Sequence, residues 1–306
     1  MDAFTRILEE SVSTKESVGI SARITHKGKD LFRGAAGYAD KEKAIPMTCD
    51  TLFRVFSNTK LVIAAAALML FEKGYFALDE PISKYLPAFK DTKVISYTGD
   101  GALTTAPAKT PVTIRHLLTM TAGYSYHIPV ALFNAPRNFE DARAITERIL
   151  SEAANTPGLT SEKMLEAIAT LPLAFEPGTG WLYGVCSDII AGLVETIVQK
   201  PFGTFLKEEI FSPLGMNETS FHPGAGALER LAVLYDYSDP QDIKPYDVSE
   251  FNFFVGFIAI IFTAGVLLSF AFALVQRMIE MVVLYIISPL TVAFNCGITA
   301  ARESGR

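Results

Sequence analysis

The sequence predicts an α/β (α+β) fold, in which an antiparallel sheet accompanies a helical domain, followed by hydrophobic transmembrane-like helices. Three observations predict it: a β-hairpin pattern over residues 18–34, a long apolar helix pattern that begins at Ser57, and a stretch without charged side chains over residues 251–275. We expect the chain to divide near residue 240 into a globular domain, residues 1–240, and a hydrophobic tail, residues 241–306.

The first element is an expected amphipathic surface helix over residues 1–10. Acidic side chains, Asp2, Glu9 and Glu10, stand where a signal peptide would have its apolar run. We therefore expect no signal peptide.

The second element is an expected β-hairpin. Residues 18–24 and residues 30–34 are rich in β-branched and apolar side chains, and they flank a turn formed by Lys27, Gly28 and Lys29. A glycine between two such runs is a hairpin signal.

The third element is an expected buried helix from Ser57 to Lys73. Its residues are mostly strong helix formers and are apolar nearly all round, and Gly74 follows as a C-terminal cap. The positive end of the helix dipole would lie beside Ser57, and the spacing of three places Lys60 next to it. Ser57 is therefore a candidate nucleophile that shares a proton with Lys60.

A family resemblance supports this interpretation. Phe53, Arg54, Ser57 and Lys60 precede the apolar helix, and residues 77–87 follow it, in an order that resembles class C β-lactamases, family VIII carboxylesterases and penicillin-binding proteins. The resemblance covers residues 1 to about 240. It implies a β-lactamase/transpeptidase-like fold and a serine hydrolase that is acylated on Ser57.

The resemblance also implies a catalytic tyrosine, which Tyr183 supplies at the end of residues 175–183. A phenol acts as a base when a nearby cation such as Lys60 stabilises its anion. The β-lactamases carry asparagine two residues after this tyrosine, whereas this chain has Val185, followed by Asp188, as in family VIII carboxylesterases. We expect Val185 and Trp181 in the substrate-binding region, and an ester rather than a β-lactam as substrate.

One family element is missing from the expected place. The superfamily carries a Lys-Thr-Gly or His/Trp-x-Gly triplet well over a hundred residues after the tyrosine, and no such triplet stands there in this chain. The resemblance then implies a C-terminally truncated fold that lacks one oxyanion donor. Activity is therefore an open question at this point.

The tail predicts a membrane segment. Residues 251–275 exceed the roughly 20 residues that a helix needs to span a bilayer core, and a second apolar run, residues 281–296, is broken by Pro289. We expect membrane lipid as a partner through residues 251–296 and a membrane location, with a cytoplasmic protein that buries this segment as the alternative. Residues 246–254 and 284–289 resemble membrane proteins of conjugative-transfer systems.

Other partners are not expected. A net charge of −6 without a basic patch argues against nucleic acid. The three cysteines lie far apart and the four histidines form no metal-ligand pair, so we expect no metal and no cofactor.

Three functions remain open. The first is a serine hydrolase acting on a small-molecule ester or amide through a Ser57 acyl-enzyme. The second is an inactive chimeric or truncated product that carries a membrane segment. The third is a membrane-tethered binding module without turnover.

Overall fold

The computed structural model describes residues 3–126, 136–236, 242–246 and 261–263. The chain forms two compact units: the first mainly from Met1–Phe53 and Gly226–Lys244, the second mainly from Arg54–Ala225. In chain order the described elements are α1 (Ala3–Ser13), β1 (Gly19–His26), β2 (Lys29–Asp40), β3 (Ile45–Pro46), β4 (Leu52–Arg54), η1 (Phe56–Asn58), α2 (Thr59–Glu72), η2 (Ile82–Lys84), η3 (Pro87–Phe89), β5 (Lys93–Tyr97), β6 (Leu103–Pro107), α3 (Ile114–Leu118), α4 (Arg137–Ala154), α5 (Ser161–Ala169), α6 (Cys186–Val198), α7 (Phe202–Leu206), η4 (Lys207–Phe211), α8 (Ala225–Leu228), β7 (Tyr235–Asp236), β8 (Lys244–Pro245) and β9 (Ile261–Thr263).

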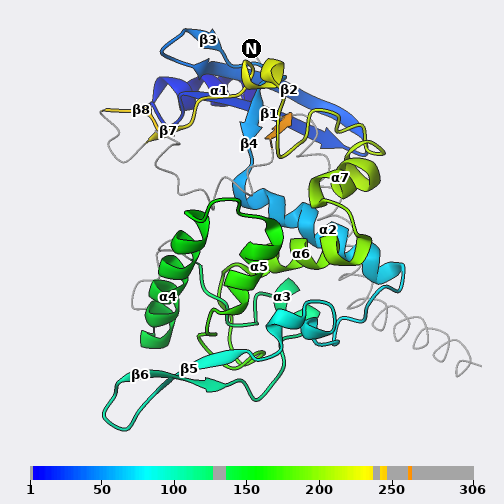
Figure 1. Cartoon of the computed structure of the whole chain (residues 1–306). Helices are drawn as coiled ribbons and strands as arrows, with labels where there is room; N and C mark the ends of the chain where they lie inside the picture. The colour runs from blue at the N-terminus through cyan, green and yellow to red at the C-terminus, as the bar shows by residue number, and fades with distance from the viewer. Residues whose placement is uncertain (1–2, 127–135, 237–241, 247–260, 264–306) are drawn as a thin grey trace, which may run out of the picture. The chain divides into compact units, whose positions relative to one another are not determined.

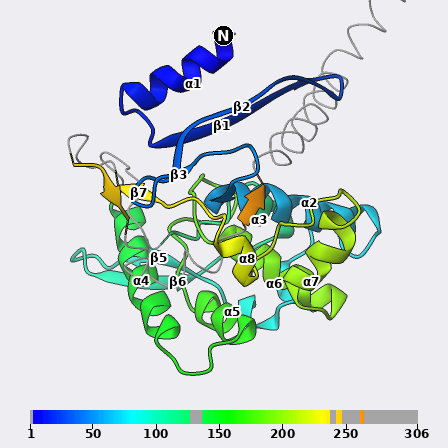
Figure 2. The ribbon, with the colours of Figure 1, turned by 90° about the horizontal axis from the view of Figure 1, so that it is seen from above.

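The first unit is built on the predicted hairpin. Strands β1, β2 and β3 form an antiparallel sheet in that order. Lys27 and Gly28 both have positive φ, 48° and 76°, which is the backbone of a tight two-residue hairpin turn. Helix α1 packs against β2, with the rings of Phe4 and Phe32 5.2 Å apart (Figure 2). The expected N-terminal helix and hairpin are both confirmed.

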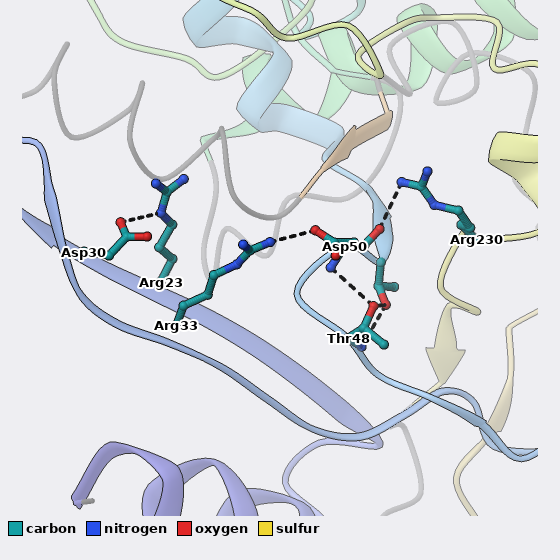
Figure 3. A network of polar contacts seen from close by, with 7 residues as sticks. Arg23, Asp30, Arg33, Thr48, Asp50 and Arg230 are labelled. Carbon is teal, nitrogen blue, oxygen red and sulfur yellow. Dashed lines mark hydrogen bonds and ion pairs between the residues drawn. The ribbon is translucent and has the colours of Figure 1, made fainter.

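A distant segment completes this unit. The backbone N–H of Leu52 donates to the carbonyl of Arg230 at 3.0 Å, and the N–H of Ala232 donates back to Leu52 at 2.8 Å. Figure 3 shows the accompanying polar network: Arg33 contacts the Asp50 carboxylate at 2.6 Å, and Arg230 donates to the Asp50 carbonyl at 3.1 Å. These groups are exposed, so each contact contributes about 1 kcal/mol or less.

The second unit is mainly helical. Helix α2 packs along α6, and α3 contacts α6 as well (Figure 1). The buried face of α2 includes Val62, Ala66 and Leu70, while Ile189 and Leu193 are buried on α6. Burying each large apolar side chain contributes about 1.5–3 kcal/mol, so this helix pair anchors the residues at the N-terminal ends of both helices.

The helix that follows the candidate nucleophile differs slightly from the prediction. It begins at Thr59 instead of Ser57, because residues 56–58 form the separate 3-10 turn η1. It ends at Glu72, and Gly74 has φ of +78°, the left-handed conformation expected of a C-terminal cap.

The predicted membrane segment falls almost entirely outside the described residues. Of residues 251–275, the structure describes only 261–263, which form strand β9 where we expected helix, and it describes none of residues 281–296. Among the described helices, none alone has the length and apolar character to cross a membrane. Cys186–Val198 and Phe202–Phe211 meet those criteria only as a pair, which is bent by 80°.

Candidate active site

Ser57 sits in a strained turn at the entrance to α2. It is the middle residue of η1, and the N–H of Asn58 closes this turn by donating to the carbonyl of Val55 at 2.9 Å. The preceding residue, Phe56, has φ of +41°, which is unfavourable for a residue with a side chain. The turn leaves the Ser57 side chain exposed. A local conformation that holds a serine hydroxyl outward suits a nucleophile.

Lys60 lies beside Ser57, as the spacing predicts. It belongs to the first turn of α2, is half-buried, and its Nζ donates a hydrogen bond to Ser57 Oγ at 3.3 Å. The same Nζ lies 4.9 Å from the ring centre of Tyr183 and 5.6 Å from that of Tyr126. Two aromatic rings therefore flank the ammonium group and favour its positive charge.

Tyr183 reaches the same oxygen from another part of the chain. Its hydroxyl donates to Ser57 Oγ at 2.7 Å from the loop that leads into α6. The next residue is Gly184, where an added Cβ would lie 2.0 Å from the carbonyl oxygen of Tyr124. Only glycine allows this close approach of two backbone segments, which brings Tyr183 beside Tyr126 with ring centres 5.7 Å apart.

The two expected substrate-binding residues lie on either side of Tyr183. Val185 is the N-cap residue of α6, and its side chain is 1% exposed. Trp181 is 60% exposed. The structure thus brings Ser57, Lys60 and Tyr183 together, buries Val185 and leaves Trp181 at the surface.

Three further ionisable groups lie around this cluster. Burial raises the pKa of the Asp188 carboxyl to about 6, against the opposing field of Lys60. Burial, with a contribution from Asp188, raises the pKa of the Cys186 thiol to about 12, so this buried cysteine stays protonated. Burial, followed by the charge of Asp188, also raises the pKa of Tyr126.

Sequence reasoning gave no role to Tyr126 or Asp188. Tyr126 follows no motif, and nothing in its neighbourhood announces a catalytic ring. Asp188 did carry one signal: it is the single acidic residue in the first turn of the otherwise apolar start of α6. An isolated carboxylate in such a segment is a reason to ask what it faces.

His116 has a structural position. Its Nδ1 accepts from the Thr113 N–H at 3.3 Å, while its own N–H donates to Thr113 Oγ1 at 3.2 Å. These two bonds form a capping box at the start of α3. They account for the conformation of this side chain without any catalytic role.

The geometry allows general-base activation of a serine. The phenol oxygen of Tyr183 can accept the proton of Ser57 Oγ once the two hydroxyl hydrogens rotate, because either hydroxyl can donate or accept. Lys60 contacts the oxygen that would become negative and faces the ring of the base. The three side chains can therefore move a proton and stabilise charge within one hydrogen-bonded group.

Comparison with known proteins gives a consistent family. The model of the family described as Beta-lactamase matches residues 4–278. Esterase EstB of Burkholderia gladioli is 31% identical over 245 residues, which cover 80% of this chain and 57% of the esterase. Acyltransferase calJ of Penicillium decumbens is 33% identical over 199 residues, which cover 64% of this chain and 44% of the relative.

A solved structure agrees with these matches. EstCE1, described as a hydrolase with promiscuous acyltransferase activity, superimposes with a TM-score of 0.63 and 26% identity, covering 79% of this chain and 57% of that protein. The chain spans about half the length of the curated relatives it matches. These matches do not bear on the resemblance of the tail to conjugative-transfer proteins, which stays a prediction.

Proposed function

Because the chain belongs to the beta-lactamase family, we propose that it transfers the acyl group of a small carboxylic ester to water through an acyl-enzyme on Ser57. One observation carries the proposal: Tyr183 at 2.7 Å and Lys60 at 3.3 Å both converge on Ser57 Oγ. A serine hydroxyl is a weak nucleophile by itself, and a base together with a nearby cation is the arrangement that activates it.

The proposed acylation step uses these three side chains. Ser57 Oγ attacks the ester carbonyl carbon while its proton moves to the phenol oxygen of Tyr183. The tetrahedral intermediate collapses, the ester C–O bond breaks, and the departing alcohol takes the proton from Tyr183. Lys60 remains an ammonium group and stabilises the negative charge on the oxygens.

Deacylation repeats the step with water. A water molecule attacks the Ser57 ester and gives one proton to Tyr183. The intermediate then releases a carboxylic acid as Ser57 Oγ recovers the proton. An alcohol in place of water would give a new ester, which is the reaction implied by the name of one relative, an acyltransferase.

An ester is favoured over a β-lactam on the basis of Val185. Its side chain carries no hydrogen-bond donor or acceptor and is buried. It therefore offers nothing to the side-chain amide that a β-lactam presents. The name of one matched relative, an esterase, agrees with this preference.

Two chromogenic substrates test the proposal. We expect the full chain to hydrolyse nitrophenyl butyrate with a rate that Ser57→Ala abolishes, and to leave a chromogenic cephalosporin intact. Hydrolysis of the cephalosporin in preference to the ester would overturn the ester assignment. Equal rates for the native chain and Ser57→Ala would overturn Ser57 as nucleophile and favour a chain that binds without turnover.

The uncharged residues 251–275 support a separate proposal, that this chain associates with lipid bilayers. Flotation of the full chain with phosphatidylcholine vesicles should carry it to the lipid fraction. Deletion of residues 251–296 should abolish flotation, and flotation that survives the deletion would contradict the proposal.

A further inference from the structure

Asp188 is a buried carboxylate that the proposed mechanism does not use. It lies in the first turn of α6, five residues after Tyr183. Its Oδ2 atom is buried and has no hydrogen-bond partner among the described residues. Buried polar atoms are nearly always paired, because leaving one unpaired disfavours folding. A carboxylate kept in this position therefore calls for an explanation outside local structure.

The charged group that acts on Asp188 is Lys60. The field of the Lys60 ammonium partly offsets the effect of burial and favours the ionised carboxylate. No charged side chain of α3, α5 or α7, the other described helices that pack against α6, contributes to the ionisation of Asp188. The neighbouring titratable groups that respond to its charge are Tyr126 and Cys186, and both favour their neutral forms.

The ordinary role of an acidic residue at a helix start does not fit Asp188. Such a residue interacts with the positive end of the helix dipole from an exposed position, and its pKa falls below the usual range. Burial instead raises the pKa of Asp188 to about 6, close to physiological pH. Ionisable groups with pKa values displaced in this direction cluster at functional sites.

We propose that Asp188 is a positioning residue that keeps Lys60 in its ammonium form against Ser57 and Tyr183. The inference rests on the proposed function and deepens it, because it assigns the roles of the two partners of Ser57. With its counter-charge in place on α6, Lys60 stabilises negative charge and does not accept the serine proton. Tyr183 is then the base.

The consequence is a specific pH dependence. As the pH falls, Asp188 takes up a proton and its charge disappears, so the half-buried ammonium group of Lys60 loses its counter-ion. Acylation of Ser57 should then slow with a midpoint near pH 6, the pKa of this carboxyl. A carboxylate with only a structural role would not move the pH profile of the nucleophile.

The test is the rate at which a fluorophosphonate probe labels the full chain between pH 5 and 8, followed by intact mass. The variant is Asp188→Asn, which keeps the shape of the side chain and removes its charge. The matched control is Glu195→Gln on the same helix, whose side chain accepts from the Phe202 N–H at 2.7 Å, a bond that glutamine can retain.

We expect Asp188→Asn to be labelled about tenfold or more slowly than the native chain at pH 7.5, as for the loss of one charged interaction, and to lose the decline near pH 6. Glu195→Gln should keep the native profile. A native profile without an ionisation near pH 6 would overturn the inference, whatever the variant does. So would an Asp188→Asn profile identical to the native one, or faster labelling of that variant, since a faster rate would make neutral Lys60 the base.

Failure of the proposed function gives a different result. If the native chain is not labelled on Ser57 at any pH, the acyl-enzyme proposal itself is wrong and this inference falls with it. If Ser57 is labelled but Asp188→Asn leaves the profile unchanged, only the inference about Asp188 is wrong.

Discussion

The hydroxyl of Tyr183 lies 2.7 Å from Oγ of Ser57, although 126 positions of sequence separate the two residues. The contact depends on the packing of α2 against α6, because Ser57 precedes one helix and Tyr183 precedes the other. The reactivity of Ser57 is therefore a property of this helix pair as much as of the local turn.

Replacing the phenol should identify it as the base. Tyr183→Phe keeps the ring near Lys60 but removes the oxygen that takes the serine proton, so probe labelling of Ser57 should slow about 100-fold to 10,000-fold. Tyr75→Phe, at a tyrosine that is 53% exposed, is the matched control and should label at the native rate. Native labelling of Tyr183→Phe would show that another group accepts the proton.

Replacing the cation should have a smaller but clear effect. Lys60→Met removes a donor and a positive charge from the oxygen that becomes negative, so ester hydrolysis should fall about 100-fold to 1000-fold. Lys73→Met serves as control, because Lys73 lies beyond the opposite end of α2 in an ion pair with Glu209 at 3.1 Å. Equal losses in the two variants would point to a general effect of lysine removal on α2.

The close approach at Gly184 should be sensitive to a single methyl group. In Gly184→Ala the new Cβ would meet the Tyr124 carbonyl oxygen at 2.0 Å, so the two backbone segments must separate. We expect a loss of about 1–3 kcal/mol in the free energy of unfolding, measured in urea, together with slower labelling of Ser57. Gly99→Ala, where nothing lies within 4 Å of an added Cβ, should change neither quantity.

Asp188 should lower stability above its pKa. Its folded pKa of about 6 lies above the unfolded value of 3.8, so the folded chain holds the proton more tightly. The stabilisation is complete below about pH 4 and is lost as the pH rises through 6. Relative to the native chain, Asp188→Asn should therefore gain up to about 3 kcal/mol between pH 4 and pH 7.5, because each tenfold difference in proton affinity between the folded and unfolded chain corresponds to about 1.4 kcal/mol. A stability difference that is independent of pH would contradict the buried, ionised carboxylate.

Local patterns predicted much of the first unit and half of the site. The hairpin turn at Lys27 and Gly28 and the helix end at Gly74 follow from residues that favour those conformations. Ser57 and Lys60 follow from a spacing of three on a helix. The helix start was misplaced by two residues, because the left-handed φ of Phe56 has no sequence signature for an aromatic residue.

The remaining features depend on tertiary packing. Tyr183 could be assigned only through family resemblance, since no local rule joins residues so distant in sequence. The field of Lys60 on Asp188 and the ring of Tyr126 beside Tyr183 arise where α6 meets α2 and the segment after α3. Burial of Val185 at the N-cap of α6 likewise follows from packing, and not from its own residue type.

Activation of Ser57 as a nucleophile underlies every step proposed for this chain. Its sharpest test is peptide mapping by mass spectrometry after a fluorophosphonate reacts with the full chain at neutral pH. We expect one adduct, on the peptide that contains Ser57, which is absent in Ser57→Ala and strongly reduced in Tyr183→Phe. An unmodified Ser57 peptide, or an adduct that persists in Ser57→Ala, would show that Ser57 is not the nucleophile.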